Sequence, residues 1–308
     1  MAGNGRPLIG IALGGGAARG WAHIGVLKSL MAAGLEPDIV AGTSIGAVAG
    51  ACYVTGRLDA LEHFATTLTR RRIFGFLDFN FAGSGLITGQ RLSARLEHHL
   101  QPFQIEELER KFVAVATELG TGHEVWLNKG SLVDALKASF ALPGIFRPVR
   151  INGRWLIDGA LVNPIPVSVC RALGARIVIA VNLNSDLLKG GIIHDQAALT
   201  ETSATPEDSH LPGTNGRAAL HLLHRQIFGR NDGAPGISSV MVDAINITQD
   251  RIARSRLAGD PPDITIGPKT GGIGLFDFHR AREAIELGAR AAEKQIEEIK
   301  AALRAFAP

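Results

Sequence analysis

A short apolar stretch that turns sharply into a run of very small residues constrains this chain more than any other part of its sequence. Residues 39–51 read as a short buried strand followed by a helix of very small residues. Between them lies Gly42-Thr-Ser-Ile-Gly46, in which Ser44 occupies the turn. A Gly-x-Ser-x-Gly turn holds its serine in a strained conformation, and small neighbours let strand and helix cross closely. The pattern therefore predicts a serine nucleophile, with Gly42 and Gly46 forming the nucleophile elbow.

The same turn also has a simpler interpretation, because the chain contains 37 glycines and such five-residue matches arise by chance. A tight packing turn between a strand and a helix would use the same residues. The helix that begins behind Ser44 favours the catalytic interpretation, since its free N–H groups and positive dipole end stabilise an alkoxide or an oxyanion. The choice depends on whether the chain also offers oxyanion donors and a base.

A second glycine-rich loop, Gly14-Gly-Gly-Ala-Ala-Arg-Gly20, lies between an apolar strand expected over 8–13 and a helix expected over 21–33. It fails both nucleotide-binding patterns. Its glycines do not follow the Gly-x-Gly-x-x-Gly spacing, and no Lys followed by Ser or Thr comes after Gly20. The remaining use for free N–H groups in such a loop is to bind an oxyanion.

We therefore expect this loop to form an oxyanion hole beside the serine. Both loops follow a short strand and open a helix, so in a parallel sheet both lie at the same carboxyl edge. Arg19 is expected to steady the loop or to contact an anionic substrate. The predicted oxyanion-hole residues are Gly15, Gly16, Ala17 and Arg19.

Attack by a serine hydroxyl needs a group that accepts its proton. Asp158 comes at the end of an apolar strand expected over 155–157 and is followed by Gly159, with a helix expected from about Pro164. Although Asp-Gly is also a common turn pair, this setting makes Asp158 the leading base candidate. A carboxylate is a weak base at neutral pH unless burial raises its pKa or its hydrogen bond to Ser44 is tight.

A histidine-dependent triad is the alternative. None of the ten histidines lies in a strand-end loop with supporting glycines. The order Ser44, Asp158, then His194 or His279 would nevertheless match that of α/β-hydrolases. A rival of another class is a non-catalytic, lipid-binding regulatory protein that keeps the same pocket.

Four blocks, in this order along the chain, resemble the bacterial patatin-like phospholipases. They are Gly14 to Gly20, Gly42-Thr-Ser-Ile-Gly46, Ala138-Ser-Phe-Ala-Leu-Pro-Gly144 and Asp158-Gly-Ala160. The resemblance implies a three-layer α/β/α sandwich with a central, mostly parallel sheet, and a Ser44/Asp158 dyad without histidine. It also implies hydrolysis of fatty acyl esters, as in a phospholipase, a lysophospholipase or a lipid esterase. Ala17 departs from the family loop, which commonly has another Gly there.

We expect residues 1–308 to form a single domain, since α/β folds of this size often do. Residues 184–215 are polar and aperiodic, which predicts a mobile loop. Residues 278–306 carry apolar side chains three or four apart and predict one closing helix docked on the body. The basic and Phe-rich stretch over 70–81 has three interpretations: core packing, an acyl-chain channel, or a lip that touches a lipid surface.

Charge and composition exclude several classes of function. The net charge of +3 is spread along the chain rather than gathered in basic blocks, so we expect no nucleic-acid partner. Cys52 and Cys170 follow no metal-binding spacing and look like reduced core thiols, and no cofactor or metal is expected. Residues 1–7 show neither a signal-peptide pattern nor a lipidation motif, so no secretion is implied and we expect a cytoplasmic protein. The Phe-rich stretch adds the expectation of peripheral contact with a membrane surface.

Overall fold

The computed structural model describes residues 6–70, 94, 96–97, 100, 102–186 and 237–306. The chain divides into two compact units, one formed by residues 1–187 with 248–308 and the other by 188–247. The first unit holds the whole of the described sheet. Because the second lies largely outside the described residues, the single domain expected over 1–308 stays a prediction.

One sheet runs through the first unit. Its strands are β1 (Ile9–Leu13), β2 (Ile39–Thr43), β3 (Lys111–Glu118), β4 (Glu124–Leu127), β5 (Val149–Ile151), β6 (Arg154–Asp158), β7 (Ile177–Val181) and β8 (Ile264–Ile266). The parallel part has the order β3-β2-β1-β7-β8, and β4, β5 and β6 join antiparallel on the side of β3. Strands β1, β2 and β7 are buried at every position, which explains their unbroken apolar sequences.

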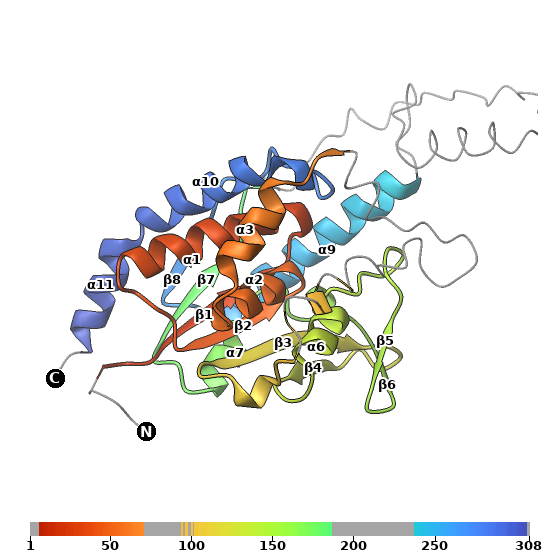
Figure 1. Cartoon of the computed structure of the whole chain (residues 1–308), viewed down its shortest axis with the longest axis horizontal. Helices are drawn as coiled ribbons and strands as arrows, with labels where there is room; N and C mark the ends of the chain where they lie inside the picture. Colours follow the sequence, from red (N-terminus) through yellow and green to blue (C-terminus); the bar gives the residue numbers. More distant parts are fainter. Residues whose placement is uncertain are drawn as a thin grey trace, which may run out of the picture. The chain divides into compact units, whose positions relative to one another are not determined.

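Helices cover both faces of this sheet (Figure 1). They are α1 (Ala22–Ala32), α2 (Ile45–Val54), α3 (Leu58–Thr66), α6 (Leu132–Ser139), α7 (Val167–Ala172), α9 (Ile237–Gly259), α10 (Ala281–Glu293) and α11 (Ile296–Ala305). One hydrophobic cluster joins one face of β1 to α1, α2, α3, α6, α10 and α11. The other joins the opposite face to α7 and to Ala253 of α9. The protein is therefore a three-layer α/β/α sandwich with a central, mostly parallel sheet, as predicted.

The closing segment differs from the single helix expected over 278–306. A short 3-10 helix, Phe278–Arg280, leads into α10, and a turn at Lys294 and Gln295 separates α10 from α11. One straight helix over residues 278–306 would extend about 40 Å, and its C-terminal part would project beyond the rest of the fold. The turn instead keeps Ile299 of α11 fully buried in the same cluster as α10. Periodicity could not reveal it, because both helices present apolar residues at helical spacing.

Helix α10 lies alongside α1, and two glycines allow the close approach (Figure 1). A Cβ atom on Gly25 would overlap the carbonyl oxygen of Ile285, and one on Gly288 would overlap that of Ala22. The two backbones are therefore in direct contact. This places the closing segment against the helix that follows the glycine-rich loop.

Two expectations fall mostly outside the described residues. The basic and Phe-rich stretch is described only at Arg70, and the mobile loop expected over 184–215 only at its first three residues, which form a turn. Both thiols, Cys52 and Cys170, are free and buried, as expected of core cysteines.

Candidate active site

Ser44 lies in the turn between β2 and α2, at the N-cap of the helix, with φ 57° and ψ −125°. This conformation is strained for a residue other than Gly. Gly42 and Gly46 are needed on either side. A Cβ atom on Gly42 would overlap the backbone of Ala47, and one on Gly46 would overlap the carbonyl oxygen of Leu13. Close packing of α2 on β1 and β2 thus dictates small residues and leaves Ser44 at the tip of the turn.

Ser139, at the C-terminal end of α6, holds the backbone of Ser44. The Ser44 N–H donates to Ser139 Oγ at 2.9 Å, and the Ser139 hydroxyl donates to the carbonyl of Val115 at 2.6 Å. Ser139 is fully buried. The sequence alone gives it no role, although it belongs to the Ala138–Gly144 segment that contributes to the family resemblance. Only the folded chain brings it next to Ser44.

Strand β3 aligns Asp158 with Ser44. In the pairing of β2 with β3, Thr43 lies opposite Val115, and in the pairing of β6 with β3, Asp158 lies opposite Ala116. Strand β4 pairs with residues 114–117 of β3, overlapping both of these registers, so β4 takes one edge of β3. Strands β2 and β6 must therefore follow one another along the other edge. Thr43, which precedes Ser44, and Asp158 thus lie beside two consecutive residues of β3.

The side chains of this pair are in direct contact. The Ser44 hydroxyl donates to Oδ2 of Asp158 at 2.7 Å, and the Ala160 N–H donates to Oδ1 at 2.8 Å. The Thr117 hydroxyl donates to the Asp158 carbonyl at 2.8 Å. Burial raises the pKa of Asp158 from 3.8 to about 6, and the hydrogen bonds from Ala160 and Ser44 oppose that rise. The carboxylate is thus a better base than an exposed aspartate and is still ionised at neutral pH.

The glycine-rich loop lies against this pair. A Cβ atom on Gly15 would lie 3.3 Å from the Cβ of Ala160 and 3.7 Å from that of Ser44. The Gly15 N–H, however, donates to the carbonyl of Pro164 at 3.1 Å. Our prediction that Gly15 supplies an oxyanion donor is therefore wrong, because its amide anchors the loop and Gly15 only lines the wall.

The next two amides are the remaining donors of the predicted oxyanion hole. The N–H groups of Gly16 and Ala17 have no recorded acceptor among the described residues, whereas Ala18 donates to the carbonyl of Leu275 at 3.0 Å. Ala17 has φ 48°, in the left-handed region that Gly adopts most readily. This conformation explains why the family loop commonly has Gly at the position of Ala17.

Arg19 is buried beneath the loop, with 1% of its surface exposed. Its Nε donates to the carbonyl of Gly16 at 3.3 Å. Burial lowers its pKa to about 10, and the nearby carboxylate of Asp186 opposes the decrease, so the guanidinium stays charged at neutral pH. Of the two roles that we considered, this position fits steadying of the loop.

Neither oxygen of the Asp158 carboxylate receives a hydrogen bond from a histidine within the described ranges. Ser44 and Ala160 are the recorded partners of these oxygens, and the ring of His279 accepts a hydrogen bond from Arg70 at 3.2 Å. His194 lies outside the described residues. These hydrogen bonds match a Ser44/Asp158 dyad and do not support a triad that includes His279.

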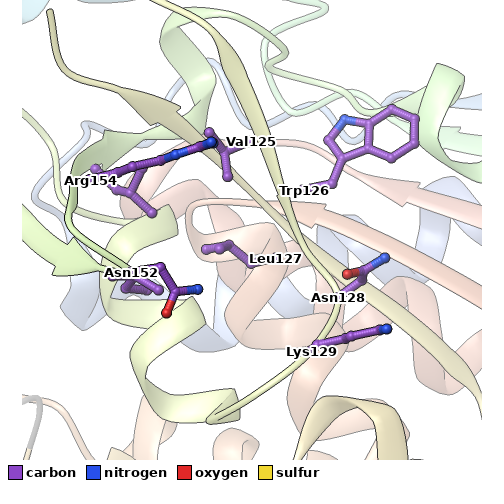
Figure 2. A pocket seen from close by; sticks show the side chains of 9 residues that line it. Val125, Trp126, Leu127, Asn128, Lys129, Asn152 and Arg154 are labelled. Atoms are coloured by element: carbon purple, nitrogen blue, oxygen red, sulfur yellow. The ribbon is translucent and has the colours of Figure 1, made fainter.

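A surface hollow of about 370 Å³ lies between β4 and the β5–β6 hairpin (Figure 2). Its lining combines apolar and basic or amide side chains: Val125, Trp126, Leu127, Asn128, Lys129, Ile151, Asn152, Arg154 and Leu156. Neither Ser44 nor Asp158 belongs to this lining. The hollow is therefore separate from the reactive pair.

The residues that the structure describes contain neither a cluster of metal ligands nor a helix that could span a membrane. No three His, Cys, Asp or Glu side chains within them come together as a metal site would require. None of the helices there has the length and apolar character needed to cross a membrane.

Comparison with known proteins identifies the family. The family model described as patatin-like phospholipase matches residues 11–171, more than half of the chain and both members of the reactive pair. An uncharacterized NTE family protein of Mycobacterium tuberculosis is 31% identical over 96% of this chain and 93% of its own length. A patatin-like phospholipase domain-containing protein of Caenorhabditis elegans is 35% identical over 58% of this chain and 14% of its own length. Among solved structures, VipD from Legionella pneumophila is similar with a TM-score of 0.46 and 11% identity, over 96% of this chain and 67% of that one. The chain belongs to the patatin-like phospholipase family.

Proposed function

We propose that this protein is a serine acyl hydrolase that cleaves fatty acyl esters of lipids with a Ser44/Asp158 dyad. The observation that carries the proposal is the 2.7 Å hydrogen bond from the Ser44 hydroxyl to the buried Asp158 carboxylate. The amides of Gly16 and Ala17, in the loop beside Ser44, support it. Membership of the family supports a lipid ester rather than another acyl compound as substrate.

The first half of the proposed reaction forms an acyl-enzyme. Asp158 takes the hydroxyl proton as Ser44 Oγ attacks the ester carbonyl carbon. The carbonyl oxygen becomes an oxyanion and accepts hydrogen bonds from Gly16 and Ala17 N–H. When the tetrahedral intermediate collapses, the carbon–oxygen bond to the alcohol breaks, and the proton on Asp158 passes to the leaving alkoxide.

The second half releases the fatty acid. A water molecule replaces the alcohol, Asp158 accepts one of its protons, and the resulting hydroxide attacks the acyl carbon. The ester bond to Ser44 then breaks, the proton returns to Oγ, and the free enzyme is restored. A base contributes about 10²–10⁴-fold and one oxyanion donor about 10²–10³-fold, so the loop and the aspartate are expected to matter comparably.

Phospholipids or lysophospholipids are the proposed substrates. Family membership supports this choice, and the Phe-rich sequence over 70–81, which lies outside the described residues, suits an acyl chain or a lipid surface. We also propose that the protein contacts the membrane surface peripherally from the cytoplasm. No cofactor takes part in the proposed reaction.

Trapping of the acyl group tests the proposal directly. The protein is incubated with a mixed lipid pool and with a fluorophosphonate, and each adduct is mapped by mass spectrometry. We expect acyl and phosphonyl adducts at Ser44 and less than about 1% of wild-type turnover in Ser44→Ala, given the size of nucleophile effects. Ser29→Ala, which changes a half-buried serine of α1, is the control and should react normally.

Two outcomes would contradict the proposal. Full activity of Ser44→Ala would exclude this nucleophile. Lipid binding with neither labelling nor turnover would instead favour the non-catalytic, lipid-binding regulatory protein.

A further inference from the structure

We propose that His23 is a positioning residue, which fixes the carbonyl of Gly14 and so keeps the Gly16 and Ala17 amides beside Ser44. This inference rests on the proposed function, in which those amides stabilise the oxyanion. The mechanism itself gives no role to His23. It is the third residue after Gly20 and lies in the first turn of α1.

The contact of His23 with the loop is short and fully buried. Nε2 of the imidazole lies 2.7 Å from the carbonyl oxygen of Gly14, and the side chain has no exposed surface. A carbonyl oxygen can only accept a hydrogen bond, so Nε2 must carry the proton and donate it. His23 is thereby defined as a donor to the glycine-rich loop.

The other ring nitrogen shows that packing alone does not explain this histidine. Nδ1 is buried and has no hydrogen-bond partner among the described residues. An unpartnered buried nitrogen is costly, and a leucine would fill similar space without that cost. Burial also lowers the pKa of His23 to about 4, so the ring is neutral at neutral pH. The bond to Gly14 is the compensating interaction that the structure offers.

Three hydrogen bonds together hold the start of the loop. The Gly14 N–H donates to the carbonyl of Val181 and the Gly15 N–H to that of Pro164, both at 3.1 Å. His23 holds the carbonyl of Gly14, which lies between these two amides in the chain. Without it, the peptide between Gly14 and Gly15 keeps only its N–H anchor and can tilt.

A tilt of the peptide between Gly14 and Gly15 would disturb the surroundings of Ser44. A Cβ atom on Gly46 would lie 2.8 Å from the Gly14 carbonyl oxygen, so this carbonyl packs against the helix that begins behind Ser44. The amides of Gly16 and Ala17 follow within three residues of Gly14. Since oxyanion donors act over hydrogen-bond distances, a shift of about 1 Å can cost up to about 10²-fold in rate.

His23→Leu and His23→Gln form the test pair, because glutamine can place an N–H near the position of Nε2 and leucine cannot. We expect His23→Leu to lower kcat about 10- to 100-fold with KM changed less than about threefold, since the lost stabilisation concerns the transition state. His23→Gln should recover most of this loss. Tyr53→Phe, which removes another buried donor to a backbone carbonyl, that of Pro37, is the control and should keep wild-type kcat.

Folding and the tautomer are measured on the same variants. Circular dichroism identifies a variant that has not folded, and selective ¹⁵N labelling of histidine reports in the wild type whether His23 is neutral with its proton on Nε2. A proton on Nδ1 would overturn the inference even if no lipid were cleaved. So would a folded His23→Leu with wild-type kcat, or His23→Gln as slow as His23→Leu. A wild type without turnover or Ser44 labelling would instead overturn the proposed function, and the oxyanion role of His23 with it.

Discussion

Ser44 and Asp158 lie 114 residues apart in the chain, yet the hydroxyl of one donates to the carboxylate of the other at 2.7 Å. Burial raises the pKa of this aspartate to about 6, which makes it a stronger base than an exposed aspartate. From this relationship and its surroundings, the following outcomes are expected.

Asp158→Asn should lower kcat about 10²–10⁴-fold, because the amide cannot accept the Ser44 proton. The fold should persist, since the change removes a buried charge and keeps the shape. Steady-state turnover and thermal unfolding measure the two effects. Asp260→Asn, at an exposed aspartate after α9, is the matched control. A variant at position 158 with normal turnover would exclude the aspartate as the base.

Activity should rise with pH through about 6, since only the ionised form of Asp158 accepts a proton. The unfolding free energy should change with pH in the opposite direction. The pKa of Asp158 is higher in the folded state than its usual value of 3.8, so its stabilising contribution is complete below that value and is lost as pH rises through about 6.

Urea unfolding between pH 4 and pH 7 tests the stability part of this prediction. The Asp158→Asn variant should lose less unfolding free energy over that interval than the wild type. Parallel curves for the two proteins would show that the carboxyl is not desolvated.

Ser139→Ala should affect both stability and rate. It leaves the Val115 carbonyl and the Ser44 N–H without their partner, at a cost of about 1–3 kcal/mol in unfolding free energy. A displaced Ser44 backbone should also lower kcat about 10- to 100-fold. Ser131→Ala, at the N-cap of the same helix, removes a bond to the Asp134 N–H. This control variant should lose about 1 kcal/mol of unfolding free energy and keep its kcat. Equal losses of kcat in both variants would contradict a specific role of Ser139.

Ala17→Gly should raise the unfolding free energy by about 0.5–1 kcal/mol. The left-handed conformation at φ 48° costs an alanine about 1–2 kcal/mol, and the added freedom of Gly in the unfolded chain cancels part of the gain. Ala17→Val should act in the opposite direction. Chemical denaturation measures both changes, and a less stable Gly variant would show that this loop conformation is not strained.

Gly25→Ala should destabilise the protein by about 1–3 kcal/mol, because a methyl group there must push α1 and α10 apart. Gly259→Ala, where an added Cβ atom would meet nothing within 4 Å, is the control and should be neutral or slightly stabilising. Melting temperatures of the two variants give the comparison. Equal melting temperatures would mean that the helix contact adjusts without cost.

The parts of the site that the sequence predicted are those specified by local patterns. The turn around Ser44, the loop from Gly14 and the strand end at Asp158 each carry their own glycines. Their meeting at one sheet edge follows from parallel strand order. The fold class could be predicted for the same reason, since unbroken apolar strands such as 9–13 alternate with helical patterns.

The parts that the sequence did not reveal depend on partners remote in the chain. The Gly15 amide is occupied by the carbonyl of Pro164, and the Ser44 amide by Ser139. No local pattern marks either bond, and the same holds for His23, whose acceptor is a backbone carbonyl. The turn between α10 and α11 was missed because it keeps the apolar side chains in helical register.

The alignment of β2 and β6 along one edge of β3 makes the distance between Ser44 and Asp158 independent of the length of the connecting segments. Adjacent rungs of a hydrogen-bonded ladder set the spacing between alcohol and acid, so insertions or deletions in the connecting segments leave that spacing untouched. Changes in those segments can therefore reshape the surroundings of the pair while the distance between hydroxyl and carboxylate stays the same.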